Sequence, residues 1–319
     1  MTPDNASWFA ETFHKLVANV GQVVKGKPQP IGLAVTCLLS EGHLLLEDYP
    51  GTGKTSLARA LADTLQGTSS RVQFTPDLLP SDVTGVTIYD QATRRFEFHK
   101  GPIFASIVLA DEINRASPKT QSALLEVMEE SKVTVDGVSH AVGNPFMVIA
   151  TQNPIEHAGT YRLPEAQLDR FLIKTNLGYP DHPSMVEILG AAQSRRHRVQ
   201  ISPLITPTAV VDMAEIAATV HVDPSLLDYV AQIAERTRTS GETTLGVSVR
   251  GCLALVRASR TWAAAHGRHF VTPDDVKSLV EPVLAHRILL EAEAEFAGTT
   301  VSDVLARILA DVPPPERRG

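Results

Sequence analysis

A glycine-rich segment at residues 48–55 (Asp-Tyr-Pro-Gly-Thr-Gly-Lys-Thr) has the residue types that bind phosphate groups. Gly51 and Gly53 allow backbone N–H groups to converge on phosphate oxygens, and the helix expected to follow adds the positive end of its dipole. Lys54 would reach the β- and γ-phosphates, while Thr55 would place a hydroxyl on Mg²⁺, a cation that prefers oxygen ligands. The segment therefore predicts a site for a nucleoside triphosphate.

The predicted nucleotide contacts extend from this loop into the first turn of the helix. In the common pattern G-x-x-x-x-G-K-[ST], glycine stands where this chain has Asp48, so the start of the loop must tolerate a side chain. A chance Gly-Lys-Thr on a strand-to-helix turn is the alternative, which the additional Gly51 disfavours. The residues expected to contact the nucleotide are Pro50, Gly51, Thr52, Gly53, Lys54, Thr55 and Ser56.

Two carboxylates and one amide follow other apolar runs of the sequence. Asp111 and Glu112 come directly after residues 107–110, and Asn153 follows residues 146–150. The carboxyl ends of parallel strands share one edge of a sheet, so these side chains are expected near the loop. Asp111 would hold Mg²⁺ through water, Glu112 would accept a proton from the water that attacks the γ-phosphate, and Asn153 would orient that water. A helix cap and a turn-forming asparagine remain the simpler alternatives.

Short apolar runs alternate with a helical pattern through the first two-thirds of the chain. Leu57, Leu61 and Leu65 recur at helical spacing, and two of the runs lack the polar alternation of a half-exposed strand. This arrangement is typical of a parallel sheet with helices on both faces, so the predicted class is α/β. The predicted strands are residues 43–47, 71–74, 103–110, 146–150 and 172–177.

Two hairpins are predicted to interrupt this pattern, near residues 85–99 and 132–142. In the second, Asp136-Gly137 lies between two alternating runs, which is a strong signal for a tight turn. Ordinary hairpins of the main sheet are the alternative interpretation. In the first hairpin, four apolar side chains are expected on one face: Val86, Ile88, Phe96 and Phe98.

A turn at residues 178–183 (Gly-Tyr-Pro-Asp-His-Pro) is the predicted boundary between two domains, 1–178 and 179–319. The second is expected to be all-α, because three pairs of residues combine a helix N-cap with proline at the first helical position. A length of 319 residues with 43% hydrophobic and 20% charged residues fits two globular domains and argues against a disordered or fibrous chain. The three pairs are Thr206-Pro207, Asp223-Pro224 and Thr272-Pro273.

Charge and cysteine content narrow the function classes. A net charge of −7 means that a polyanion would need a local basic stripe, so nucleic acid is not the expected partner. Cys37 and Cys252 lack the spacing of a zinc site or a disulfide framework and are expected in the core. Asp4 and Glu11 interrupt any signal sequence, and no later run approaches the ~18 apolar residues of a membrane span. A cytoplasmic protein is the expectation.

Four segments together resemble the MoxR family of AAA+ ATPases. They are residues 42–55, 73–82, 163–171 and 246–250, so the resemblance covers nearly the whole chain. It implies an ATPase core with a P-loop and a parallel sheet between helices, followed by a helical lid. It also implies ATP and Mg²⁺ as cofactors, a homo-oligomeric ring usually of six subunits, and a chaperone-like role on proteins with von Willebrand factor A domains.

The resemblance also assigns residues that spacing alone does not. Arg170 matches the arginine finger that reaches the neighbouring subunit's γ-phosphate, and Arg250 matches a second sensor that would act from the lid of the same subunit. Gly26 matches the loop over the adenine. The hairpins resemble the helix-2 insert and the pre-sensor-1 hairpin, both facing the partner. Two departures from the family pattern are Arg162, which competes with Arg170 as the finger, and Val249, which replaces a frequent proline.

Three functions remain open on the sequence. The first is an ATP-hydrolysing ring that moves its hairpins against a protein partner. The second is a DNA-acting motor, suggested by Arg94 and Arg95 in the first hairpin, although the second hairpin offers only Lys132 and His140 and residues 195–198 could form a solvated helix end. The third is a binding module switched by slow nucleotide turnover, against which Glu112 argues.

Overall fold

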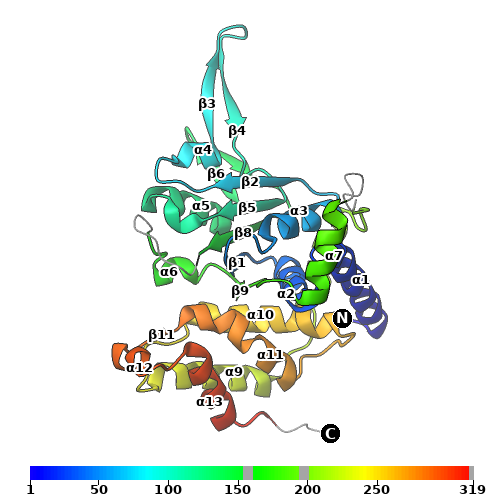
Figure 1. The fold of residues 1–319 in the computed structure, drawn as a ribbon, viewed down its shortest axis with the longest axis vertical. Helices are drawn as coiled ribbons and strands as arrows, with labels where there is room; N and C mark the ends of the chain where they lie inside the picture. The colour runs from blue at the N-terminus through cyan, green and yellow to red at the C-terminus, as the bar shows by residue number, and fades with distance from the viewer. Residues whose placement is uncertain (154–160, 194–200, 316–319) are drawn as a thin grey trace.

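The computed structural model of the chain describes residues 1–153, 161–193 and 201–315, so the basic run at 195–198 lies outside the described residues. Its centre is a five-stranded parallel sheet with the strand order β2-β5-β8-β1-β9 (Figure 1). The predicted α/β class with a parallel sheet is therefore confirmed. The strands of this sheet are β1 (Leu44–Glu47), β2 (Ser69–Gln73), β5 (Ile107–Asp111), β8 (Met147–Gln152) and β9 (Ile173–Thr175).

Helices surround the sheet and make up most of the C-terminal part, which also contains a small antiparallel pair, β10 (Thr243–Leu245) and β11 (Leu289–Leu290). The helices are α1 (Pro3–Gly21), α2 (Pro28–Leu39), α3 (Lys54–Thr64), α4 (Pro80–Thr84), α5 (Pro118–Glu130), α6 (Glu165–Leu168), α7 (His182–Gln193), α8 (Pro207–Ala218), α9 (Pro224–Thr239), α10 (Val249–Ala265), α11 (Pro273–Leu284), α12 (Ala292–Phe296) and α13 (Val301–Asp311), with short 3-10 helices η1 (Ile113–Arg115) and η2 (Ala285–Arg287).

The central strands are apolar on both faces because both faces are covered. In β1, Leu44 and Leu46 belong to one hydrophobic cluster and Leu45 to another. The first cluster includes side chains of α1, α2, α3 and the C-terminal helices, and the second includes side chains of α5. Successive side chains of a strand point to opposite faces, so burial on two sides accounts for the uninterrupted apolar sequence.

The predicted helix starts in the C-terminal part are confirmed. The side chains of Thr206, Asp223 and Thr272 each accept a hydrogen bond from a backbone N–H in the first turn of α8, α9 and α11. Each cap satisfies a donor that the helix itself leaves unpaired.

The strand predicted for residues 103–110 begins only at Ile107. Before that point two backbone N–H groups donate to partners outside the sheet. Ile103 N–H donates to Val83 O, and Ser106 N–H donates to the hydroxyl of Thr68. These partners belong to loops and to α4, so the segment cannot join the parallel ladder.

Both predicted hairpins are present, as β3 (Gly85–Asp90) with β4 (Arg95–Lys100), and β6 (Lys132–Val135) with β7 (Val138–Ala141). The first projects from the body of the molecule at the end opposite the C-terminal helices (Figure 1). The rings of Phe98 and His140 stack with centroids 4.2 Å apart, so the two hairpins are in contact.

The expectation that four apolar residues share one face of the first hairpin is wrong. Val86 lies opposite His99 and Ile88 opposite Glu97, whereas Phe96 lies opposite Tyr89. Residues opposite each other in an antiparallel pair share a face. The register therefore places Val86 and Ile88 on one face, and Phe96, Phe98 and Tyr89 on the other.

Two glycines close the base of this hairpin. A Cβ added to Gly85 would lie 2.3 Å from His99 O, and one added to Gly101 would lie 2.4 Å from Val83 O. Any side chain at either position would push the two chains apart.

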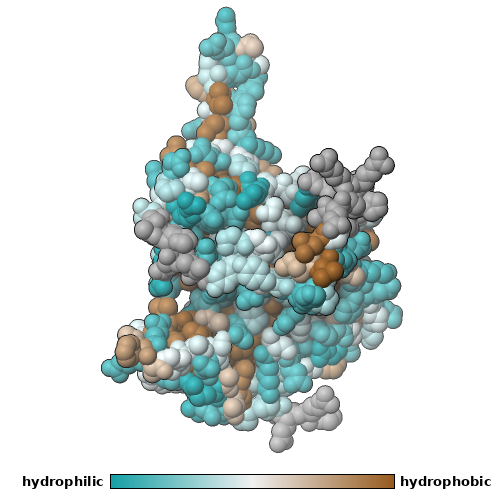
Figure 2. Space-filling view, viewed as in Figure 1, coloured by the Kyte–Doolittle hydropathy of each residue, from teal (hydrophilic) through white to brown (hydrophobic). Residues whose placement is uncertain are grey.

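Helix α7, the first after the predicted domain boundary, packs on the N-terminal part of the chain. Lys25 Nζ lies 2.7 Å from Glu187 Oε1, so α7 lies against the segment that joins α1 to α2 (Figure 1). Most of its side chains are exposed, and Figure 2 shows a hydrophobic patch over this helix. The exposed apolar residues are Met185, Val186, Ile188 and Leu189. In the described part of the chain, no helix has the length and apolar character required to cross a membrane.

A buried arginine joins the C-terminal helices to the core. Arg287 is 5% exposed, and its guanidinium donates to Asp169 Oδ1 at 2.7 Å, to Phe171 O at 2.6 Å and to Val283 O. Burial and this neighbouring charge lower the pKa of His286, so the adjacent imidazole stays neutral and adds no repulsion. The planar fork of Arg287 thus satisfies acceptors from both parts of the chain.

We expect Arg287→Lys to lower the free energy of unfolding by about 2–4 kcal/mol, because an ammonium cannot reach all of these buried acceptors. Urea unfolding followed by circular dichroism measures the change. The exposed Arg307, which pairs with Glu242, provides the matched control. Arg307→Lys should change the free energy by less than about 0.5 kcal/mol. Equal midpoints for the two variants would contradict the role of Arg287.

Candidate functional site

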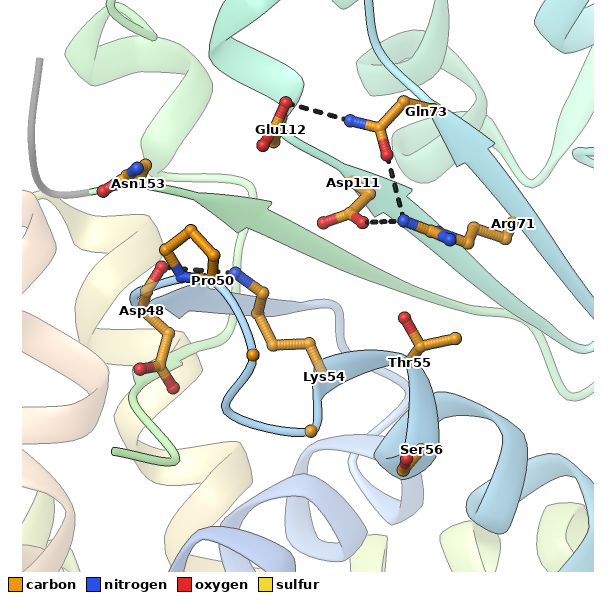
Figure 3. Close-up of a pocket in the computed structure, with 12 residues that line it drawn as sticks. Asp48, Pro50, Lys54, Thr55, Ser56, Arg71, Gln73, Asp111, Glu112 and Asn153 are labelled. Carbon is orange, nitrogen blue, oxygen red and sulfur yellow. Dashed lines mark hydrogen bonds and ion pairs between the residues drawn. The ribbon is translucent and has the colours of Figure 1, made fainter. Parts of the chain in front are cut away.

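A cavity of about 390 Å³ lies at the carboxyl edge of the parallel sheet (Figure 3). It brings together the glycine-rich loop, the start of α3 and the ends of β2, β5 and β8. Lys54, Asp111 and Asn153, which are far apart in sequence, therefore line a single cavity. Its lining residues are Asp48, Pro50, Gly51, Gly53, Lys54, Thr55, Ser56, Arg71, Gln73, Asp111, Glu112 and Asn153.

The loop has the conformation that its glycines predict. Gly51 and Gly53 have φ values of +85° and +100°, in the region that favours glycine, and an added Cβ at either would meet no atom within 4 Å. Backbone conformation, rather than crowding, requires glycine here. Lys54 Nζ donates to Asp48 O at 3.2 Å and to Tyr49 O at 3.3 Å, which folds its side chain over the loop. The ammonium thus faces the cavity that the loop encloses (Figure 3).

Asp48, the departure from the common pattern, has a structural role that the sequence does not show. It is 2% exposed, and its Oδ2 accepts from Leu177 N–H at 2.6 Å and from Gly178 N–H at 3.1 Å. Its Oδ1 accepts from Tyr49 N–H at 3.0 Å. The carboxylate therefore ties the start of the loop to the chain that leaves β9, a contact that glycine could not make.

Asp111 and Glu112 are both bound by Thr151, a buried residue of the neighbouring strand β8. The Thr151 hydroxyl donates to Asp111 Oδ1 at 2.6 Å and accepts from Glu112 N–H at 2.9 Å. Glu112 has a φ of +56°, an uncommon value for a residue with a side chain. Strained backbone of this kind persists where the surroundings fix it, and Thr151 supplies part of that constraint.

Other polar side chains hold both carboxylates. Arg71 Nη2 lies 2.7 Å from Asp111 Oδ2, while Gln73 Nε2 at 2.9 Å and Arg115 Nη1 at 2.8 Å both donate to Glu112 Oε2. Sequence reasoning missed Arg71 and Gln73 as lining residues, because the resemblance at residues 73–82 gave Gln73 no role and no motif includes Arg71. The pairing of β2 with β5, which no local pattern predicts, brings both side chains to the cavity.

The donor set fits Mg²⁺ with a bound nucleotide. Asp111 and Thr55 face each other across the cavity (Figure 3). A carboxylate and a hydroxyl, completed by phosphate and water oxygens, are the usual ligands of this cation. No three His, Cys, Asp or Glu side chains group closely enough to hold a metal within residues 1–153, 161–193 and 201–315. The protein alone would thus supply only part of the coordination.

Two residues of the predicted nucleotide set do not line the cavity. The Thr52 hydroxyl donates to Tyr49 O at 3.2 Å and so braces the loop from within. Gly26, with a φ of +70°, lies against the start of α7, where an added Cβ would be 2.3 Å from Ser184 Oγ. Arg162 is exposed and lines neither this cavity nor the one described next.

The two remaining arginines meet at a second cavity of about 1110 Å³ between the core and the C-terminal helices. Arg170 Nη2 lies 3.0 Å from Glu129 Oε2, and Arg250 Nη2 lies 2.8 Å from Glu129 Oε1. Among the described residues, none lines both cavities. A sensor acting on its own subunit's phosphate would belong in the first cavity, whereas Arg250 lies beside Arg170 in the second.

We expect Thr151→Val to reduce ATP turnover while leaving the fold intact. Valine preserves the shape but leaves Glu112 N–H without its acceptor and Asp111 Oδ1 without its donor, each worth about 1–3 kcal/mol. The rate of phosphate release measures the effect on turnover, and urea unfolding checks that the fold is intact. Thr134→Val, on the exposed hairpin β6–β7, is the matched control. Wild-type turnover of Thr151→Val would exclude the positioning role.

Two family models match the chain. The ATPase family associated with various cellular activities (AAA) matches residues 43–173, and the AAA lid domain matches residues 235–308. The phosphate loop and both carboxylates lie within the first match, and Arg250 lies within the second.

Individual relatives match along nearly the full length. The Bacillus subtilis protein YeaC is 46% identical, over 96% of this chain and 95% of the relative. Chaperone MoxR1 of Mycobacterium tuberculosis is 38% identical, over 98% of this chain and 86% of the relative. A crystal structure of a candidate ATPase from Cytophaga hutchinsonii superposes with a TM-score of 0.92 at 35% identity, covering 98% of both chains. The chain belongs to the MoxR family of AAA+ ATPases.

Proposed function

We propose that this protein hydrolyses ATP with Mg²⁺ and uses the cycle to remodel or activate protein partners. The observation that carries the proposal is the single cavity shared by Lys54, Asp111, Glu112 and Asn153. It presents a cation and loop N–H groups for phosphate, together with a carboxylate and an amide that could act on water. The relative named Chaperone MoxR1 supports a chaperone-like role.

In the proposed reaction each residue has a separate task. Backbone N–H groups of the loop and Lys54 bind the phosphates, and Thr55 and Asp111 hold Mg²⁺, which neutralises phosphate charge. Glu112 accepts the proton of the attacking water, and Asn153 orients that water. Because Gln73 and Arg115 both bind Glu112 Oε2, its other oxygen is the one available to the water.

We further propose that the site is completed by a neighbouring copy of the chain. Arg170 and Arg250 line a cavity separate from that of Lys54. In the proposed assembly both arginines, in the positions that they already occupy, contact the nucleotide of another subunit. This extends the intersubunit role from Arg170 to Arg250 and replaces the expectation that Arg250 acts within its own subunit. A closed homo-oligomeric ring, hexameric in our proposal, provides such contacts between every pair of neighbours.

For the partner we propose a protein with a von Willebrand factor A domain, contacted by the projecting hairpins. Figure 2 shows hydrophobic surface along the stem of the first hairpin, where Ile88, Tyr89 and Phe96 are exposed. In the half of the hairpin nearer its tip, the carboxylates of Asp90 and Glu97 balance the positive charges of Arg94 and Arg95. Balanced charge beside exposed aromatic residues suits a protein surface better than a polyanion.

Glu112→Gln tests both hydrolysis and the partner. The amide cannot accept the proton, so turnover should fall by about 10²-fold or more while ATP binding persists. With ATP, this variant should retain a von Willebrand factor A protein that the wild type releases. Glu126→Gln, on the exposed side of α5, is the control. Equal turnover in the Glu112→Gln and wild-type proteins would remove Glu112 from the mechanism and favour a slowly switched binding module.

Arg170→Ala tests the intersubunit site. We expect nucleotide affinity to change little and turnover to fall by about 10³-fold, the range typical of an arginine finger. Calorimetric titration with a non-hydrolysable analogue and phosphate release measure the two quantities. Arg162→Ala should retain turnover. If instead Arg162→Ala loses it and Arg170→Ala does not, the finger is Arg162.

A further inference from the structure

Three charged side chains from separate elements meet at the second cavity. Glu129 lies in the last turn of α5, Arg170 precedes β9, and Arg250 lies in the first turn of α10. Each oxygen of the Glu129 carboxylate binds one guanidinium, at 3.0 Å for Arg170 and 2.8 Å for Arg250. One carboxylate therefore links an arginine of the core with an arginine of the lid.

The backbones that carry the two arginines are also linked. Asp169 Oδ2 accepts from the Ser248 hydroxyl at 3.0 Å, and Ser248 caps the N-terminus of α10. Asp169 Oδ1 is held by the buried Arg287 at 2.7 Å. Arg170 and Arg250 therefore start from fixed positions, and Glu129 determines where their guanidinium groups lie.

The position of Glu129 is itself fixed by the sheet. His43 Nε2 lies 3.0 Å from Met128 O, and Val148 N–H donates to His43 Nδ1 at 3.0 Å. Since Nδ1 accepts, Nε2 carries the hydrogen and donates to the carbonyl next to Glu129. Burial lowers the pKa of His43 to about 4, so this bridge is neutral at physiological pH.

We propose that Glu129 is a positioning residue that holds Arg170 and Arg250 side by side as one unit for the triphosphate of a neighbouring copy. The inference rests on the proposed intersubunit site. Two guanidinium groups repel each other, and a carboxylate between them removes that repulsion and sets their spacing. Fixed spacing places both cations correctly before the γ-phosphate gains charge in the transition state.

Glu129→Gln is the first test, because the amide keeps the size of the side chain and loses its charge. Phosphate release at saturating ATP should fall about tenfold, with the KM for ATP changed less than about threefold, since Glu129 lies outside its own subunit's nucleotide cavity. Glu130→Gln is the matched control: it neighbours Glu129 but pairs with Lys132 at 3.4 Å. It should keep wild-type turnover. Glu129→Asp, too short to bind both arginines, gives an independent second variant.

A mixing experiment separates positioning from a general structural effect. Glu112→Gln subunits have inactive sites but intact arginines, and Glu129→Gln subunits have the reverse. Mixed assemblies should therefore exceed the turnover of either variant alone, because an intact site then faces intact arginines. A fold defect in the Glu129→Gln subunit would give no such recovery.

The outcomes distinguish the two proposals. The same mixing is done with Arg170→Ala subunits in place of Glu129→Gln subunits. If turnover recovers in both mixtures, the intersubunit site and the role of Glu129 are both supported. Recovery for Arg170→Ala with wild-type or faster turnover of Glu129→Gln overturns the role of Glu129 and leaves the intersubunit site standing. No recovery for Arg170→Ala overturns the intersubunit site, and the inference about Glu129 with it.

Discussion

Parallel hydrogen bonding between β1, β8 and β5 is the constraint on which the nucleotide cavity depends. Leu46 pairs with Thr151 and Glu47 with Gln152, while Ala110 pairs with Ala150. This register ends all three strands at the same level, so that the loop after β1, the carboxylates at the end of β5 and the amide after β8 emerge together. A shift of one residue in any strand would turn its side chains to the opposite face and separate the groups.

Four buried polar side chains link the elements that surround the two cavities. Thr151 joins the ends of β5 and β8, Asp48 joins the loop to the chain after β9, and Arg287 joins the C-terminal helices to Asp169. His43 does the same between β8 and α5. Each would be costly if left unpaired in the interior, and each contributes instead by bonding to backbone or charge on a second element. Apolar clusters stabilise the layers, and these four side chains orient the groups with chemical roles.

The structural features that depend on residues adjacent in the sequence were predicted correctly. Glycine, proline and cap residues identified the phosphate loop, the Asp136-Gly137 turn and the helix starts. Partners distant in sequence were not predictable: nothing near Asp48 indicates Leu177, and nothing near Glu129 indicates Arg250. The face assignment in the first hairpin failed for a similar reason, because register depends on the length of the turn, here ending in Arg94 with a φ of +54°. The location of Arg250 depends on how the lid docks, which no local pattern encodes.

The hairpin β3–β4 has the shape of a lever arm, because it projects from the body of the molecule (Figure 1). Its strands of 6 residues each reach about 20 Å at the usual rise per residue. The close approach of Gly85 and Gly101 leaves no room for a side chain at its base, which is the pivot of such an arm, and the stacked rings of Phe98 and His140 link it to the second hairpin. A tilt of about ten degrees at the pivot would sweep the tip through about 3–4 Å, so a small rearrangement beside the sheet becomes a displacement the size of a side chain.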